Sequence, residues 1–452
     1  MRGGATQRVT AAFRSGPLAV RSFRLLAGGQ LASTIGDYCY AVALPWLVLS
    51  NHGSTILLGT VLACYGVPRT VLIPVGGILA DKLGPRSLML SADVLRCVLV
   101  GVLTFLAARH TASLITLGPT AALIGGGEGL FLPASFTIMP SLLDGDRLAA
   151  GNALSSTAVQ VGSLIGPAIG GALVAATGAS TAAFGIDAVS FAASAVSLAL
   201  IPRHAAAGSM AASLARTADP MTGLADPMTG LADTAPDSTA TGPPGKPPGM
   251  LAYIRRSRAI QVIMVVAIAA NLANGGQGEV ALPALAHAHW GAGGYGTLLA
   301  CMAAGAVIGT LAAARSGRLR NPAAVASTAF IIGAAAIALV PYLGGEAGAA
   351  AALLLLGVCN GLGNVLFYTM AQRSIPPAIL GRVLSMIMLC TYGVFPLSVA
   401  VAGVLVRHLG TTPFFPIAGI FLTVAILGGN TQRAFRDFGR QAEPSQRENQ
   451  PV

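Results

Sequence analysis

Apolar runs of about 20 residues recur along the whole chain, and each is long enough to cross a lipid bilayer as a helix. Charged residues make up only 10% of the 452 residues, whereas a soluble protein has roughly 25%. The alternating apolar and polar residues of a membrane-spanning strand are absent. The chain is therefore predicted to be an all-α, multi-pass protein of the cell membrane.

The apolar runs predict twelve spans. Because twelve is an even number, the two termini are expected on the same side of the membrane. The predicted spans are 24–49, 55–80, 88–108, 114–140, 151–176, 181–202, 259–284, 293–314, 322–342, 347–370, 383–406 and 412–431.

Basic residues in the loops predict which side that is. The loops on the side opposite the termini carry only Arg109 and Arg407. The excess of positive charge on the terminal side predicts that both termini are cytoplasmic. There it faces anionic lipid, so the net charge of +11 does not call for a nucleic-acid partner. The basic residues on the terminal side are Lys82, Arg86, Arg147, Arg315, Arg318, Arg320, Arg373 and Arg382.

A segment rich in Pro, Gly, Ser and Thr separates six spans from six. It contains the direct duplication ADPMTGLADPMTGLAD, which is either a docking motif or a scar of replication slippage, and its composition predicts a disordered cytoplasmic linker. The halves also echo each other, as in GTVLAC and GTLLAC. Repeated halves are typical of transporters whose site lies between two bundles. The predicted divisions are a cytoplasmic tail 1–23, a bundle 24–202, the linker 203–258, a bundle 259–432 and a cytoplasmic tail 433–452.

The loop GILADKLGPR after the second span combines charge with glycine. Gly77 would let two helices approach closely, and Gly84 would allow a tight reversal. Asp81 lies at a helix C-terminus, where a carboxylate needs a partner such as Lys82, Arg86 or a neighbouring helix N-terminus. The loop is either a latch that one conformation makes and another breaks, or an ordinary hairpin.

The fifth span contains GSLIGPAIGG. Gly162, Gly166 and Gly170 are four residues apart and form one groove for close packing. Pro167 permits a kink, and Gly171 widens the groove. The pattern predicts a bent, closely packed helix where the two bundles meet, with packing alone as the alternative to a gating role.

These motifs resemble known families. GxLADKxGxR is similar to the loop signature of the major facilitator superfamily, with Pro85 at a position that is usually basic, and GSLIGPAIGG resembles the fifth-span signature of its drug–proton antiporters. GDYCYAVALPWLVLS, FLPASFTIMPSLL and GNALSS resemble the twelve-span branch that includes macrolide and enterobactin exporters. The resemblance extends over about residues 24–432. It implies two six-helix bundles, with spans 1, 4, 7 and 10 around a central cavity.

The sequence departs from that family at two points. Many drug antiporters carry an arginine in the fourth span, whereas this span reads IGGGEGLF with Glu128, so coupling through that arginine is not implied. The loop RSGRLRNP of the second half lacks the acid of its counterpart in the first. Any latch there would be weaker or different.

Charged residues inside the spans are candidates for function, because a charge at the bilayer centre costs about 2.5–3.5 kcal/mol on insertion scales. Asp37 and Glu128 lie near mid-membrane, where a desolvated carboxylate can take up and release protons. Each could instead form a structural ion pair with Arg69 or Arg96. Asp93 and Arg96 are predicted to pair locally. Asp187 and Glu279 lie in the outer thirds of their spans and are weaker candidates.

Uncharged polar residues form stripes at helical spacing. In lipid, such a stripe must face either a wet cavity or another helix. We expect a cavity, because the resemblance implies that spans 1, 7 and 10 line one, and its remaining wall would be apolar. The stripes are Gln30, Ser33 and Asp37; Asn271, Asn274 and Gln277; and Asn360, Asn364 and Tyr368.

The predicted function is secondary active export of a small amphipathic or hydrophobic compound, such as a drug, an antibiotic or a siderophore. Proton antiport and alternating access would drive it. The partners would be the substrate, protons and the bilayer, and the protein would be a monomer. The alternative is an importer or facilitator of a metabolite. Nucleotide-binding and hydrolase motifs are absent and the six cysteines lack CxxC spacing, so no enzyme activity, cofactor or metal is predicted.

Overall fold

The computed structural model describes residues 16–109, 111, 113–143, 145–202, 255–315, 321–374 and 377–432. The predicted tail 433–452 lies outside the described residues, as do most of the tail 1–23 and of the linker 203–258. Arg318 and Arg320 also lie outside them, together with the side chains of Tyr368, Arg373 and Arg382.

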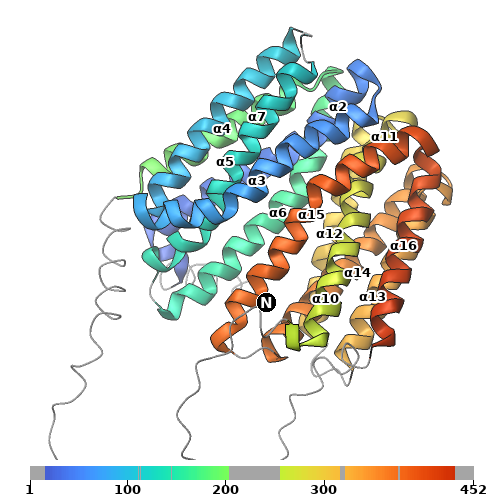
Figure 1. Ribbon diagram of the computed structural model, residues 1–452. Coiled ribbons are helices and arrows are strands. Elements are labelled where there is room, and N and C mark those ends of the chain that lie inside the picture. Colours follow the sequence, from blue (N-terminus) through green and yellow to red (C-terminus); the bar gives the residue numbers. More distant parts are fainter. Residues whose placement is uncertain are drawn as a thin grey trace, which may run out of the picture.

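Each half contributes six membrane-length helical segments (Figure 1). In the second half, the first segment consists of α10, η2 and α11 in succession. The first half contains the short η1 (Pro17–Ala19), then α2 (Arg21–His52), α3 (Thr55–Leu83), α4 (Pro85–Ala108), α5 (Leu114–Leu142), α6 (Gly145–Thr177) and α7 (Thr181–Ala199). The second contains α10 (Arg258–Gly276), η2 (Gln277–Ala281), α11 (Leu282–His289), α12 (Gly291–Arg315), α13 (Pro322–Leu339), η3 (Val340–Tyr342), α14 (Gly345–Ser374), α15 (Pro377–Leu409) and α16 (Thr411–Thr431).

All twelve predicted spans are confirmed as helices. Within the described residues, eleven helices are long and apolar enough to cross a membrane, and α15 adds the shorter apolar segment Gly393–Leu409. Most helices run a few residues past the predicted apolar limits, because backbone hydrogen bonding continues beyond the hydrophobic stretch. The largest differences are at the starts of α6 and α15, which begin at Gly145 rather than 151 and at Pro377 rather than 383.

Individual residues fix the two ends of α3, at Gly84 in the predicted latch loop and at Ser54 in the loop before it. Gly84, between α3 and α4, has φ of 82°, a conformation that only glycine adopts without strain. The predicted reversal at Gly84 is therefore confirmed. At the other end of α3, the Ser54 side chain caps the helix by accepting a hydrogen bond from the amide of Leu57.

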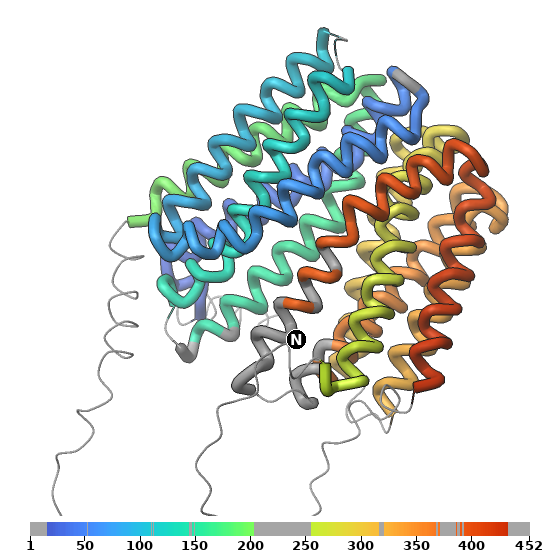
Figure 2. The backbone as a smooth tube through the Cα atoms, viewed as in Figure 1, coloured from blue at the N-terminus to red at the C-terminus, as the bar shows by residue number. Residues whose placement is uncertain are grey.

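The two halves form separate groups of helices, coloured blue to green and yellow to red in Figure 2. Within the first half α2 packs against α6 and α7, and α3 against α5. Within the second half α14 packs against α12 and α13, and α10 against α15 and α16. Between the halves, the principal contacts are α3 with α15 and α6 with α12.

The closest approaches between the halves lie toward one end of the molecule, here named the closed end, which carries the turns at Gly53, Gly178 and Gly291. The Thr55 hydroxyl donates to the carbonyl of Gly403 at 3.1 Å. A Cβ added at Gly171 would lie 2.7 Å from the carbonyl oxygen of Ala292. The opposite end of the molecule is here named the loop end, and it carries the turn at Gly84 between α3 and α4.

The seventh span changes its helical geometry next to a contact with α15. The Ser398 hydroxyl of α15 donates to the carbonyl of Leu272 and accepts from the amide of Gly276, both at 2.7 Å. In an α-helix that amide and that carbonyl belong to the same turn, so the hydroxyl bonds to both ends of one turn of α10. The π-helical η2, which contains Gln277 and Glu279, follows immediately.

Candidate functional site: a charged cavity between the halves

A cavity of about 990 Å³ lies mainly within the first half and reaches the second at Glu279 and Phe395. Toward the loop end its wall includes Phe136 and Val159, whose side chains are exposed. Six charged residues singled out from the sequence line it: Asp37, Arg69, Arg96, Glu128, Asp187 and Glu279. Gln30 and Ser33, which share the stripe of Asp37, line it too.

Glu128 is paired within this cavity. One carboxylate oxygen lies 2.9 Å from a guanidinium nitrogen of Arg69, and the other accepts a hydrogen bond from the Tyr65 hydroxyl. The glycines around Glu128 make this possible, because a Cβ at Gly125 or Gly129 would collide with the backbone of α3. The run IGGGEG thus brings α5 against α3. Sequence reasoning missed Tyr65, although those flanking glycines were a signal of close approach.

Arg96 is the more enclosed of the two guanidinium groups of the site, with 3% of its side chain exposed against 19% for Arg69. It lies 2.6 Å from Asp93, which also accepts a hydrogen bond from the Ser194 hydroxyl at 2.6 Å. The rings of Phe131 and Phe191 lie 4.7 and 4.3 Å from the guanidinium carbon, which adds cation–π attraction. The predicted pair of Asp93 and Arg96 is confirmed, and it is a buried structural unit.

Asp37 is held far less tightly. Its nearest guanidinium nitrogen, on Arg96, is 3.9 Å away, and 49% of its side chain is exposed. Arg96 is already bonded to Asp93, so it compensates Asp37 only in part. Among the carboxylates of the cavity, Asp37 is therefore the one most open to protons and to a bound molecule.

Asp187 and Glu279 belong to the same cavity, although their positions near span ends suggested that they could reach the membrane surface. Asp187 is only 1% exposed, with the Ser190 hydroxyl 3.4 Å from its carboxylate, and it is close enough to Asp37 and Arg96 to interact electrostatically with both. Glu279 interacts in the same way with Arg69. Both acids therefore face inward.

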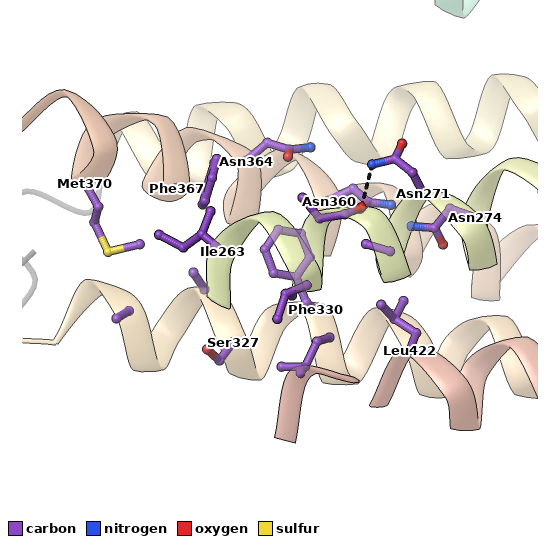
Figure 3. Close-up of a pocket in the computed structure, with 16 residues that line it drawn as sticks. Ile263, Asn271, Asn274, Ser327, Phe330, Asn360, Asn364, Phe367, Met370 and Leu422 are labelled. Atoms are coloured by element: carbon purple, nitrogen blue, oxygen red, sulfur yellow. Dashed lines mark hydrogen bonds between the residues drawn. The ribbon is translucent and has the colours of Figure 1, made fainter. Parts of the chain in front are cut away.

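The amide stripes of the second half lie elsewhere. Asn271, Asn274, Asn360 and Asn364 line a separate cavity of about 410 Å³ inside the second half (Figure 3). Gln277 is buried. The expectation that all three stripes share one cavity therefore needs correction: helices α10 and α14 turn these amides toward α13 and α16.

Among the described residues, the predicted latch is not made in this conformation. Asp81 and Lys82 are exposed, and no ion pair among the described residues includes Asp81. Arg86 instead donates to the carbonyls of Leu198 and Ala199, at 2.9 and 2.8 Å. Those carbonyls belong to the C-terminal end of α7, where the carbonyl of Leu198 also accepts from the amide of Ile201. In this conformation Arg86 therefore joins α4 to α7.

The expectation that Gly77 lets two helices approach closely must also be corrected. A Cβ at Gly77 would meet nothing within 4 Å, whereas one at Gly76 would lie 2.8 Å from Pro133 and 2.9 Å from Leu130. The approach of α3 to α5 therefore depends on Gly76. The reason is rotational, since adjacent residues on a helix point in directions about 100° apart.

The fifth-span motif is divided between two neighbours. A Cβ at Gly162 would lie 2.6 Å from Thr34, one at Gly166 2.5 Å from Tyr38, and one at Gly170 2.9 Å from Cys39. This groove receives α2 of the same half. The helix itself does lie where the halves meet, as expected, because α6 packs against α12, but the groove of Gly162, Gly166 and Gly170 is not the surface that makes that contact. Of the motif's glycines, Gly171 contacts the other half, at Ala292 and Gly296, and the carbonyl of Pro167 also lies against Gly296.

The cavity brings four carboxylates and two guanidinium groups together. Among them, Glu128 and Arg69 form a close ion pair at 2.9 Å. In the described part of the chain, no group of three His, Cys, Asp or Glu side chains is placed to hold a metal ion.

Curated relatives are similar to part of the chain. The multidrug efflux pump Tap of Mycolicibacterium fortuitum is 29% identical over 171 residues, which are 36% of this chain and 40% of Tap. The putative multidrug resistance protein MdtD of Yersinia pseudotuberculosis is 27% identical over 152 residues, or 33% of this chain and 31% of MdtD. The matches thus span less than half the length of these relatives.

Solved structures share the fold over nearly the whole chain. A bacterial homologue of the iron transporter ferroportin in an inward-facing state has a TM-score of 0.63 at 17% identity, covering 93% of this chain and 98% of its own. A POT family transporter in complex with 5-aminolevulinic acid has a TM-score of 0.68 at 14% identity, covering 91% and 96%. At these identities the likeness concerns the fold alone.

The sequence profile of the Major Facilitator Superfamily matches residues 26–399, which is most of the chain. Its secondary transporters are not enzymes, and they move small-molecule substrates across membranes. The match agrees with the twelve helical spans and the two halves described above. The chain belongs to the Major Facilitator Superfamily.

Proposed function

We propose that this transporter exports a small amphipathic or hydrophobic compound, driven by proton antiport. The observation that carries the proposal is the half-exposed Asp37 in a cavity between the halves, with its nearest guanidinium already bonded to Asp93. Such a carboxylate can gain or lose a proton without dismantling the fold. The partial similarity to two proteins named for multidrug efflux or resistance supports export as the direction.

The conformation fits one stage of such a cycle. If the termini are cytoplasmic, as the loop charges predict, the closed end faces outside and the loop end faces the cytoplasm. The cavity then receives substrate from the cytoplasm. The superfamily fold is expected to alternate by rocking of one bundle against the other, so the contacts of Thr55 and Gly171 with the second half would break in the outward-open state.

The proposed coupling uses Asp37 and Glu128 in different ways. A proton that enters from outside neutralises Asp37 and weakens its hold on the substrate, which leaves to the outside. A proton on Glu128 would release Arg69 from its 2.9 Å contact and free the guanidinium for the cavity. Loss of both protons to the cytoplasm would restore the conformation described here.

The first experiment is a susceptibility panel of antibiotics and siderophores in a host that lacks its own pumps, with and without a protonophore. A compound that the protein exports is then followed in everted vesicles by its uptake and by the accompanying proton movement. The variant Asp37→Asn with Glu128→Gln is expected to abolish proton-coupled uptake. Glu346→Gln, at an exposed acid of α14 that lines neither cavity, is the matched control.

Two results would overturn the proposal. Uptake that continues after collapse of the pH gradient would exclude proton antiport, as would full coupled uptake by the double variant. Accumulation rather than depletion of the compound in intact cells would favour an importer or facilitator.

A further inference from the structure

The cavity of about 410 Å³ inside the second half has the size of a small-molecule site. It lies among α10, α13, α14 and α16, away from the contacts between the halves. Figure 3 shows Asn271, Asn274 and Asn360 toward one end of the cavity and Met370 toward the other. Three of the four amides are therefore grouped at one end, Asn364 and Ser327 lie between the two ends, and the rest of the wall is largely apolar.

Among the described residues, the wall contains no charged side chain, only amides, one hydroxyl and apolar groups. The Asn271 side chain donates to the carbonyl of Ala267 at 2.9 Å. The side-chain oxygen of Asn274 is buried and accepts no hydrogen bond from any described residue. An unpaired buried acceptor is costly, and a ligand with an N–H or O–H group would satisfy it.

This cavity also adjoins a route toward the centre of the molecule. Asn360 and Asn364 line it on one side and a second space, of about 420 Å³, on the other. Gln160 lines that second space and also the charged cavity. A chain of amides thus leads from the charged cavity to the interior of the second half.

We propose that the cavity of the second half is a second ligand site, which takes an uncharged, largely apolar molecule that carries a hydrogen-bond donor. Its ligand class differs from that of the charged cavity, where four acids favour protons and cationic groups. The site depends on the shape and the amides of the second half, and it does not depend on proton coupling.

The test is binding of N-phenyl-1-naphthylamine, an uncharged aromatic amine whose fluorescence rises in apolar surroundings, to the full-length protein in lipid nanodiscs. We expect a saturable component above the linear signal from lipid. Ala326→Phe fills the cavity from α13 and should remove the saturable component. Thr328→Phe, on the exposed face of the same helix, adds a similar volume outside the cavity and should leave it unchanged.

Asn274→Leu tests the hydrogen bond without filling the cavity. It should weaken binding roughly 3- to 10-fold, as expected for one hydrogen bond, and it decides the question if Ala326→Phe does not fold. The variant Asp37→Asn with Glu128→Gln should bind the probe as the natural protein does. Failure of proton-coupled export would therefore leave this inference intact.

The inference is overturned if the natural protein shows no saturable binding, or if a folded Ala326→Phe variant binds as tightly as the natural protein. Unchanged affinity in Asn274→Leu would exclude the hydrogen bond and with it the ligand class. Loss of binding in the double acid variant would place the probe in the charged cavity.

Discussion

The two halves share an architecture but keep their polar groups inside the membrane in different ways. Six of the seven charged residues found within the spans belong to the first half, and only Glu279 belongs to the second. The first half holds them around one cavity as pairs and partial pairs. The second half holds neutral amides around another.

The difference bears on both proposals. A buried charge pair is costly to break, because the group left behind is uncompensated, which supports the proposed response of the first half to a proton. An amide hydrogen bond between membrane helices is worth only about 0.6 kcal/mol on average, which supports the proposed neutral-ligand site of the second half. Four predictions follow from this contrast, beginning with the largest effect.

Removal of Arg96 should destabilise the protein most. Arg96→Leu leaves the fully buried Asp93 without its cation, and loss of one partner of a buried pair costs about 3–5 kcal/mol. Asn360→Leu, the comparable change in the second half, should cost at most about 1 kcal/mol. Reversible unfolding in mixed micelles measures both. Equal losses would remove the contrast between the halves.

The junction of the halves is tested at Gly171. Gly171→Ala places a methyl group 2.7 Å from the carbonyl of Ala292, and overpacking of this kind costs about 1–3 kcal/mol. A free-energy change of that size changes a conformational equilibrium roughly 5- to 150-fold. Here it should disfavour the conformation in which the halves meet at the closed end. Distances between spin labels across the halves report the shift. Gly101→Ala, where a methyl group meets nothing within 4 Å, should change none of them.

The π-helical segment of the second half is tested at Ser398. Ser398→Ala removes both hydrogen bonds from α15 to the amide of Gly276 and the carbonyl of Leu272. We expect a loss of about 1 kcal/mol and a change in hydrogen exchange over 276–281. Thr423→Ala, which removes a hydroxyl bonded to its own helix at Gly419, is the control. An unchanged exchange pattern would mean that the π-helical segment does not depend on the serine.

The smallest effect is expected at Asp81. Because Asp81 is exposed and unpaired among the described residues, Asp81→Asn should change the stability of this conformation by less than about 0.5 kcal/mol. Arg86→Gln removes the buried bonds to α7 and should cost more. If Asp81 is a latch, its variant lowers the transport rate without lowering stability. Unchanged transport would leave the loop as an ordinary hairpin.

Individual residues show how far sequence reasoning reached. It identified Glu128 as an interior acid but could not choose between Arg69 and Arg96 as its partner. The choice depends on Gly125 and Gly129, which let α5 approach the backbone of α3 beside Arg69. Likewise, the spacing of Gly162, Gly166 and Gly170 predicted a groove but not that α2 fills it.

The amide stripes show the same limit. Helical spacing places Asn271 with Asn274 on one face of α10, and Asn360 with Asn364 on one face of α14. It does not say which neighbour that face meets. The rotation of each helix in its bundle decides this, and here it points the amides into the second half rather than into the charged cavity.

The sequence by itself determined the twelve helical spans, the resemblance to the superfamily and the identity of the interior charges. In a bilayer these properties can be read from each segment alone. Every spanning segment must form its own backbone hydrogen bonds, and charged residues inside it are rare and tend to have a function. Only the tertiary structure decided the pairing of Glu128 with Arg69, the freedom of Asp37, the separation of the two cavities and the end at which the halves meet. Those features depend on contacts between helices far apart in the chain, which no single segment encodes.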